Sequence, residues 1–221
     1  MTVPQRLAGI FALLALAAAA LILARPQFTN ASQPQRGMHN PVVAIQVIQS
    51  LADVDDILSD APSPDREVMR LKQYLDFGFI AAYTGLLLTL AYLLTGVGSW
   101  ARIAGIAAGI CALGAAAFDV LEDLATLRIL DVKLAATTSP MMNAIRSAAF
   151  AKWSLLAVTL ALLSTYFLRQ ATWTKRPLGA LLLLGAALQA YGLADNVWLE
   201  RQVYVLGAAL IWLIALFFRV R

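Results

Sequence analysis

Ionisable side chains stand at the ends of apolar stretches, at spacings that could gather them into one layer. Asp76 directly precedes one stretch and Asp119 directly follows another, and Lys152 and Asp195 hold corresponding places further along the chain. Carboxylates beside a lysine can form buried ion pairs, and carboxylates in excess can bind a cation or hold a proton. The pattern therefore indicates a polar layer whose chemistry is either structural or ligand-binding.

More residues extend this predicted layer. Its members are Asp76, Asp119, Glu122, Asp123, Lys152 and Asp195, with Arg70 and Arg146 above them. One interpretation is an interhelical salt-bridge network that sets helix register and closes the outer end of a bundle. The other is a site for a cation, a proton or a polar lipid headgroup. No apolar stretch is broken or charged near its centre, where transporter sites usually lie, and this argues against transport.

Residue types that many catalytic and metal sites require are scarce. His39 is the single histidine and Cys111 the single cysteine. Haem held by two histidines, a CxxC site and an intrachain disulfide therefore lack residues. The sequence contains no phosphate-binding glycine loop, HExxH or GxSxG motif. An intramembrane protease built on Asp119 and Asp195 is conceivable, but the flanking residues match no such motif. We predict a non-catalytic protein with no cofactor and no resident metal ion.

The composition is that of a membrane protein. Apolar residues make up 61% of the 221 residues and charged residues 14%, against about 45–50% and 25% in soluble domains. Mean hydropathy is +0.74. These values exclude a soluble enzyme, a nucleic-acid-binding domain and a disordered chain. Helices satisfy their own backbone in lipid, so an all-α fold with six transmembrane helices is expected. The apolar stretches are residues 7–24, 77–101, 103–118, 153–168, 178–194 and 202–218.

Basic residues predict the orientation. With a cytoplasmic N-terminus, the inner segments contain seven basic residues and no acidic one, and all 13 carboxylates lie outside. The positive-inside rule then places both termini in the cytoplasm of a bacterium, with the protein in its inner membrane. Residues 7–24 could instead be a cleaved signal peptide, which would leave five spans in the same orientation. The length of this stretch favours an uncleaved first helix.

Residues 25–63 are predicted to form a small periplasmic cap. Ser50 and Asp53 resemble a capping box that opens a short amphipathic helix. Its apolar face would contain Leu51, Val54, Ile57 and Leu58, and its acidic face Asp53, Asp55, Asp56 and Asp60. The acidic face is either simply solvated or a docking face for a basic partner or a divalent cation. The spacing is not that of an EF-hand loop.

Two Ser-Pro pairs, at 63–64 and 139–140, mark helix starts 76 residues apart. Arg70 matches Arg146 and Asp119 matches Asp195 at this offset. The offset predicts a parallel repeat of two helices, residues 64–134 and 139–201, that together form a core four-helix bundle. Residues 1–24 and 202–221 would supply a helix each outside it. Alternatively, the helix starts coincide by chance. The helices that begin at both pairs, and the one that continues to Leu130, should project beyond the membrane.

The stretches LDFGFIAAY (75–83) and FDVLEDL (118–124) resemble uncharacterised multi-pass membrane proteins of bacteria. The resemblance covers about residues 42–170 and implies no activity, substrate or cofactor. Our leading hypothesis is a structural or accessory subunit that presents the cap to a partner complex or to a second copy. The alternative is a small transporter, or an ion-, proton- or lipid-headgroup-binding protein that uses the carboxylate layer. The expected partners are the lipid bilayer and a protein, and not nucleic acid.

Overall fold

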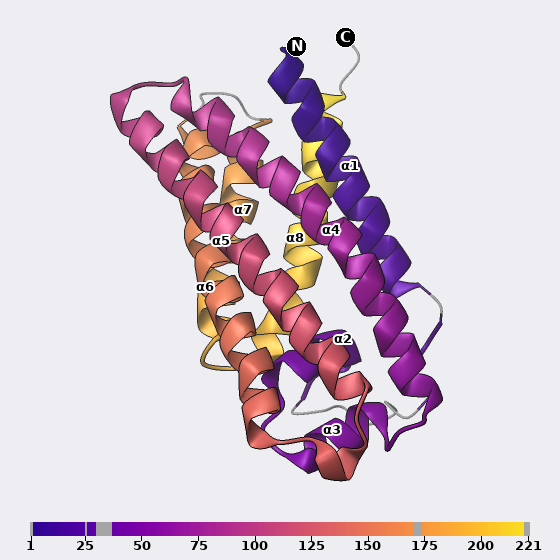
Figure 1. The fold of residues 1–221 in the computed structure, drawn as a ribbon. Coiled ribbons are helices and arrows are strands. Elements are labelled where there is room, and N and C mark those ends of the chain that lie inside the picture. Colours follow the sequence, from indigo (N-terminus) through magenta and orange to yellow (C-terminus); the bar gives the residue numbers. More distant parts are fainter. Residues whose placement is uncertain (1, 25, 30–36, 170–173, 219–221) are drawn as a thin grey trace.

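The computed structural model describes residues 2–24, 26–29, 37–169 and 174–218, and its regular elements are all helices. Successive long helices run antiparallel, with the start of α1 and the end of α8 at one end of the molecule (Figure 1). The long helices are α1 (Val3–Leu23), α4 (Pro64–Thr95), α5 (Ser99–Leu130), α6 (Ser139–Leu168), α7 (Arg176–Gly192) and α8 (Val197–Phe217). The short ones are α2 (Pro41–Ala44), η1 (Ile45–Val47), α3 (Leu51–Leu58) and η2 (Leu134–Ala136).

Five helices, α1, α4, α5, α6 and α8, are long and apolar enough to cross a membrane. The sixth long helix, α7, has 17 residues and is not among them. Large apolar side chains such as Ile103, Ile110 and Leu113 are exposed along α5, and lipid tails can cover a surface of this kind. The all-helical prediction is therefore confirmed and five helices suggest a membrane protein, whereas the count of six spans is not confirmed.

Local sequence signals explain where the longest helices begin and end. The Ser63 hydroxyl accepts a hydrogen bond from the Arg66 N–H (3.3 Å), and Pro64 begins α4 as predicted. Ser139 lies inside α6, whose N-cap is Thr138, so the second Ser-Pro pair marks the helix start without supplying a cap. Helices α4 and α5 have 32 residues each, or about 48 Å at 1.5 Å per residue. They exceed the roughly 30 Å of membrane hydrocarbon.

The projecting ends of α4, α5 and α6 carry the cap, which we define as residues 38–63. Figure 1 shows α2 and α3 at the end of the bundle opposite the start of α1 and the end of α8. A second apolar core joins the cap to the bundle; it includes Met38, Ile45, Ile48, Val54, Ile57, Leu58, Met69, Ile129, Leu130 and Ile145. Leu51 departs from the predicted apolar face, because its side chain is 41% exposed.

Acidic side chains of the cap make local contacts. The Asp53 carboxylate accepts hydrogen bonds from the N–H groups of Gln49 (2.7 Å) and Ser50 (3.0 Å), which completes the predicted capping box of α3. The backbone N–H groups of Leu134 (2.7 Å) and Ala61 (2.8 Å) donate to Asp60 and hold its pKa below the ordinary value. Two acids of the predicted acidic face therefore stabilise the cap itself.

The long helices pack as a ring in chain order. Each of α4 to α7 packs against the next helix in the chain, and α1 closes the ring by packing against both α4 and α8. Helices α4 and α7 are not among the substantial packing pairs. The predicted four-helix core of α4 to α7 is therefore wrong, because α1 and α8 complete the circle instead of lying outside it. The repeat stays a prediction, with α5 and α7 differing in length.

Close approach of α5 to α4 at Gly105 gives a stability test. A Cβ at Gly105 would lie 2.6 Å from the Ala91 carbonyl oxygen, whereas a Cβ at Gly78 would meet nothing within 4 Å. We expect Gly105→Ala to destabilise the protein by about 1–3 kcal/mol through overpacking. Gly78→Ala should be neutral or stabilise by up to about 1 kcal/mol through helix propensity. Thermal unfolding in detergent measures both, and equal midpoints for the two variants would contradict this packing.

Candidate functional site

A charged cluster lies where α4, α5 and α6 leave the apolar bundle for the cap. Lys152 of α6 is at its centre, and its Nζ lies 2.8 Å from Asp119 Oδ1 on α5. The same Nζ forms an ion pair with Glu122 Oε2, one turn further along α5. All three side chains are buried. The ammonium group therefore joins two helices through two carboxylates in apolar surroundings.

Tyr83 brings α4 into the same network. Its hydroxyl donates a hydrogen bond to Asp119 Oδ2 (2.8 Å), so both oxygens of this carboxylate have a partner. Tyr83 is not among the residues predicted for the layer. It follows Asp76 by about two helical turns and therefore shares a face with it, a signal that could have found this residue.

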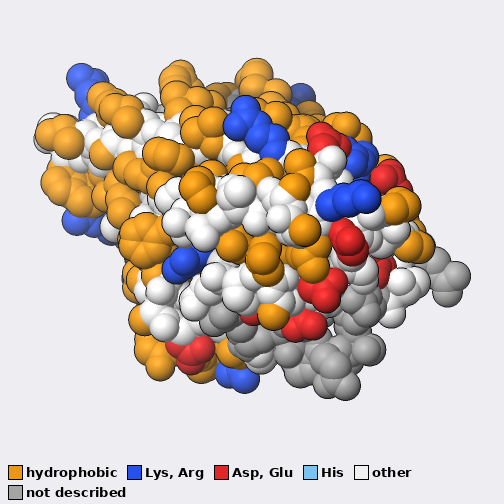
Figure 2. Space-filling view, turned by 60° about the horizontal axis from the view of Figure 1, so that its bottom comes forward, with side chains coloured by type: hydrophobic (Ala, Val, Ile, Leu, Met, Phe, Trp, Pro, Cys, Tyr) orange, Lys and Arg blue, Asp and Glu red, His pale blue; other side chains and the backbone are white. Residues whose placement is uncertain are grey.

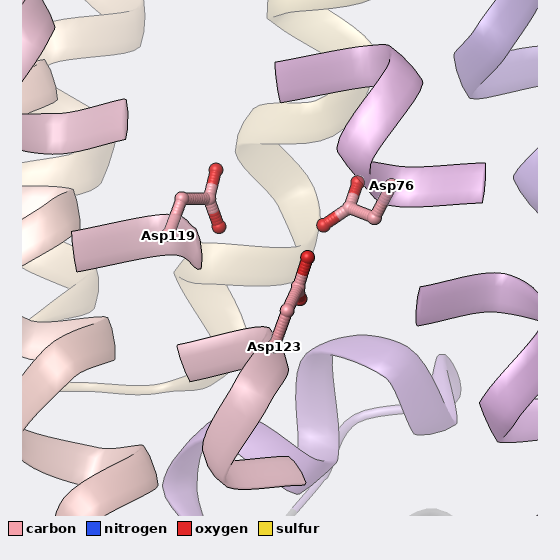
Figure 3. A group of neighbouring side chains, drawn as sticks. All are labelled: Asp76, Asp119 and Asp123. Atoms are coloured by element: carbon pink, nitrogen blue, oxygen red, sulfur yellow. The ribbon is translucent and has the colours of Figure 1, made fainter. Parts of the chain in front are cut away.

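Three aspartates meet beside the lysine. Carboxylate oxygens of Asp76, Asp119 and Asp123 all lie within 4.8 Å of one another. Figure 3 shows Asp76 on α4 and the other two on α5, with their carboxylates turned toward one another. Asp123 is 1% exposed, and neither of its oxygens has a hydrogen-bond partner among the described residues. With Glu122, the cluster contains four carboxylates and the ammonium group of Lys152, which pairs with two of them, so carboxylates are in excess.

Three residues of the predicted layer lie elsewhere. Asp195 is exposed in the turn after α7, where its carboxylate accepts a hydrogen bond from the Val197 N–H (3.4 Å). Arg70 pairs with Asp131 (2.9 Å) instead of the cluster, and Arg146 is exposed on α6. The layer thus consists of the other five predicted residues and Tyr83.

Helix geometry explains these differences. Helix α7 ends at Gly192, so the side chain of Asp195 follows a turn and not a helix face. Each arginine precedes Asp76 or Lys152 by six residues. A helix rotates by about 600° over six residues, which is equivalent to 240°, so each arginine points away from the ionisable group that follows it.

The cluster is linked to the cap. Trp153, next to Lys152, donates from its indole Nε1 to Gln46 Oε1 in η1 (2.9 Å). The Lys152 ammonium lies 4.6 Å from the centre of the Trp153 ring, a cation–π contact. A displacement of Lys152 would therefore disturb the hydrogen bond between its neighbour Trp153 and Gln46 of the cap.

Two buried cations outside the cluster stabilise helix ends. Arg66 donates from Nη1 to the carbonyl oxygens of Ile129 (2.8 Å) and Val132 (2.7 Å) at the end of α5. Lys72 donates to the carbonyl oxygens of Ile22 and Ala24 at the end of α1. The last carbonyls of a helix lack internal partners and carry partial negative charge, so a cation suits them. The sequence gives no signal for these contacts, because their acceptors are distant backbone atoms.

Comparisons of the chain with protein-family models, with curated proteins and with solved structures find no match. The kind of protein is therefore described from its fold and its charged cluster. The protein has a ring of long helices, five of them long and apolar enough to span a membrane. It also has a buried carboxylate–lysine cluster at the end of the ring that carries the cap.

Tyr83 provides a test of the cluster. Tyr83→Phe keeps the aromatic ring and removes the hydrogen bond to Asp119. Hydrogen bonds to charged groups contribute about 1.5–3 kcal/mol, so we expect a loss of stability in that range. Tyr92→Phe on the same helix is the matched control, because Tyr92 is 66% exposed. If thermal unfolding in detergent gives equal midpoints for the two variants, the Tyr83 hydrogen bond does not hold Asp119.

Proposed function

We propose that the chain is a non-catalytic, multi-pass protein of a bacterial inner membrane that presents its cap to a protein partner. The supporting observation is the construction of the cap, whose own apolar core packs against the projecting ends of α4, α5 and α6. The Trp153–Gln46 hydrogen bond and the contacts of Arg66 add polar links. A structural or accessory subunit needs a rigid platform of this kind outside the bilayer.

The proposed topology has six crossings with both termini in the cytoplasm. This proposal is supported by the start of α1 and the end of α8, which lie at the same end of the ring (Figure 1), as expected for an even number of crossings. The 17 residues of α7 span about 25 Å, and this helix packs against both α6 and α8. The positive-inside rule supports a periplasmic cap.

The outer face of α3 is the proposed contact surface. Asp55 and Asp56 are exposed there, beside the partly exposed apolar side chain of Leu51. Figure 2, in which the cap end is brought forward, shows acidic side chains interspersed with apolar and basic ones. A negative face with apolar neighbours suits a partner with a basic rim around an apolar centre.

A second candidate function is ligand binding at the charged cluster, either as a binding protein or as a small transporter. The observation that favours it is the charge imbalance, with four carboxylates and one lysine in the cluster. Groups of this kind at the membrane boundary are normally paired or face a ligand.

Cysteine labelling tests the topology. In a Cys111→Ala background, we expect Asp56→Cys to react with a membrane-impermeant maleimide in spheroplasts. Val97→Cys, in the exposed turn between α4 and α5, should react only after the membrane is opened, because it lies at the opposite end of α4. The reverse pattern would contradict the proposed orientation.

Photo-crosslinking in native membranes tests the contact surface. A photoreactive residue in place of exposed Ala52 should give a discrete protein adduct, and an adduct of twice the mass would identify a second copy. Ile110, which is 66% exposed on α5, is the control position facing lipid. Reversing the charges of Asp55 and Asp56 to lysine should remove the adduct. No adduct at position 52, or the same adducts at both positions, would contradict this function.

A further inference from the structure

We propose that Asp76, Asp119 and Asp123 form a binding site for a hard divalent cation of the size of Ca²⁺, which joins α4 to α5 below the cap. The site gives a ligand class to the second candidate function and does not depend on the role of the cap. Three carboxylates supply the oxygen donors that such cations prefer.

The donor set suits this ion. One carboxylate oxygen from each of the three aspartates lies within 4.8 Å of the other two. Neighbouring ligands of a Ca²⁺ ion, each bound at about 2.3–2.6 Å, fall within this separation. Ca²⁺ accepts a flexible coordination geometry, whereas Mg²⁺ demands a near-ideal octahedron and loses its bound water reluctantly. Three carboxylates from two helices therefore favour direct binding of Ca²⁺ over Mg²⁺.

Asp123 is the independent sign of a ligand. Its side chain is 1% exposed, and within the described part of the chain both of its oxygens lack a hydrogen-bond partner. Figure 3 shows this carboxylate directed toward Asp76 and Asp119. An ionised carboxylate that is buried without a partner is costly, and two further carboxylates beside it increase the repulsion. A cation between them removes both penalties.

Lys152 does not fill this role. Its ammonium group is engaged by Asp119 Oδ1 and Glu122 Oε2, and no ion pair of Lys152 with Asp76 or Asp123 is found among the described residues. A carboxylate oxygen that accepts one hydrogen bond can still coordinate a metal through its remaining lone pair. Asp119 can therefore belong to the ion-pair network and to the cation site at once.

Two further oxygens lead from the site toward the cap. Gln73 precedes Asp76 by three residues and Thr126 follows Asp123 by three, so each shares a helix face with its aspartate. Both side chains are buried, and Gln73 Oε1 and Thr126 Oγ1 have no hydrogen-bond partner among the described residues. Each oxygen lies about one helical turn from its aspartate. Water molecules held by these oxygens would complete the coordination of the cation, since Ca²⁺ takes six to eight oxygen ligands.

Metal-dependent stability of the full-length chain in mild detergent tests the site. After chelation and exchange into metal-free buffer, CaCl₂ should raise the midpoint of thermal unfolding with a saturable dependence. MgCl₂ should require higher concentrations. Asp123→Asn should weaken the apparent Ca²⁺ affinity by about tenfold or more. Asp195→Asn, which removes an exposed carboxylate outside the cluster, should leave the affinity unchanged.

Asp123→Asn relieves repulsion between carboxylates, so we expect its midpoint without metal to be at or above that of the unmodified chain. Asp76→Asn is the second variant and should also weaken Ca²⁺ binding. If Ca²⁺ does not change the midpoint of thermal unfolding of the folded, unmodified chain, the proposed site is wrong. That result would indicate that the carboxylates share protons instead. A Ca²⁺ response retained in both variants would also overturn it. Crosslinking from the cap is independent of these outcomes, so failure of either proposal can be recognised separately.

Discussion

The buried ammonium group of Lys152 forms the interaction on which the cap end of the helical ring depends. It compensates Asp119 and Glu122, two carboxylates that the apolar bundle could not otherwise accommodate as ions. Removing one partner of a buried ion pair typically costs about 3–5 kcal/mol, because the other charge is left uncompensated. Tyr83 extends the network to α4, and Trp153 extends it to the cap. The network around the Lys152 ammonium group therefore fixes the relative positions of three long helices, α4, α5 and α6, and of the short helix η1.

The same electrostatic constraint accounts for the ends of the helices. Long helices that project from an apolar belt expose their last carbonyl groups near low-dielectric surroundings, where they need donors. Arg66 supplies donors to α5 and Lys72 to α1, both from α4. Helix α4 thus carries the cations that terminate two neighbouring helices, in addition to Asp76 and Tyr83 in the cluster.

Much of the architecture was predictable from the sequence because it depends on local patterns. Uninterrupted apolar stretches predict the long helices, and Ser63-Pro64 predicts the start of α4. Asp119 and Lys152 directly flank such stretches, so their shared level followed from helix lengths alone. The ring closure by α1 and the position of Asp195 were not predictable in this way. Ring closure depends on small residues of α1 that pack against α4 and α8. The position of Asp195 depends on α7, which ends at Gly192, three residues before this aspartate.

The partners of Arg66 and Lys72 mark a further limit of sequence patterns. Both cations bind backbone carbonyl groups, which every residue has, so no residue type identifies the acceptor. Tyr83 is only partly predictable. Its spacing from Asp76 indicates the helix face on which it lies, but not that its hydrogen-bond partner is Asp119. The acidic face of the short helix was predicted to be either solvated or a docking face, and neither alternative foresaw a role for these acids within the cap. Asp53 and Asp60 accept backbone hydrogen bonds that build the cap, a role that depends on turns which the sequence alone leaves open.

A double-mutant cycle between Lys152 and Asp119 tests the central interaction most directly. Lys152→Met, Asp119→Asn and the double variant would be unfolded reversibly in detergent and compared with the unmodified chain. Lys152→Met alone should be the most destabilising change, and Asp119→Asn should lessen its effect. We expect the double variant to be more stable than the sum of the single effects by about 1–3 kcal/mol. Additive effects, within about 0.5 kcal/mol, would show that the two charges do not hold the helices together.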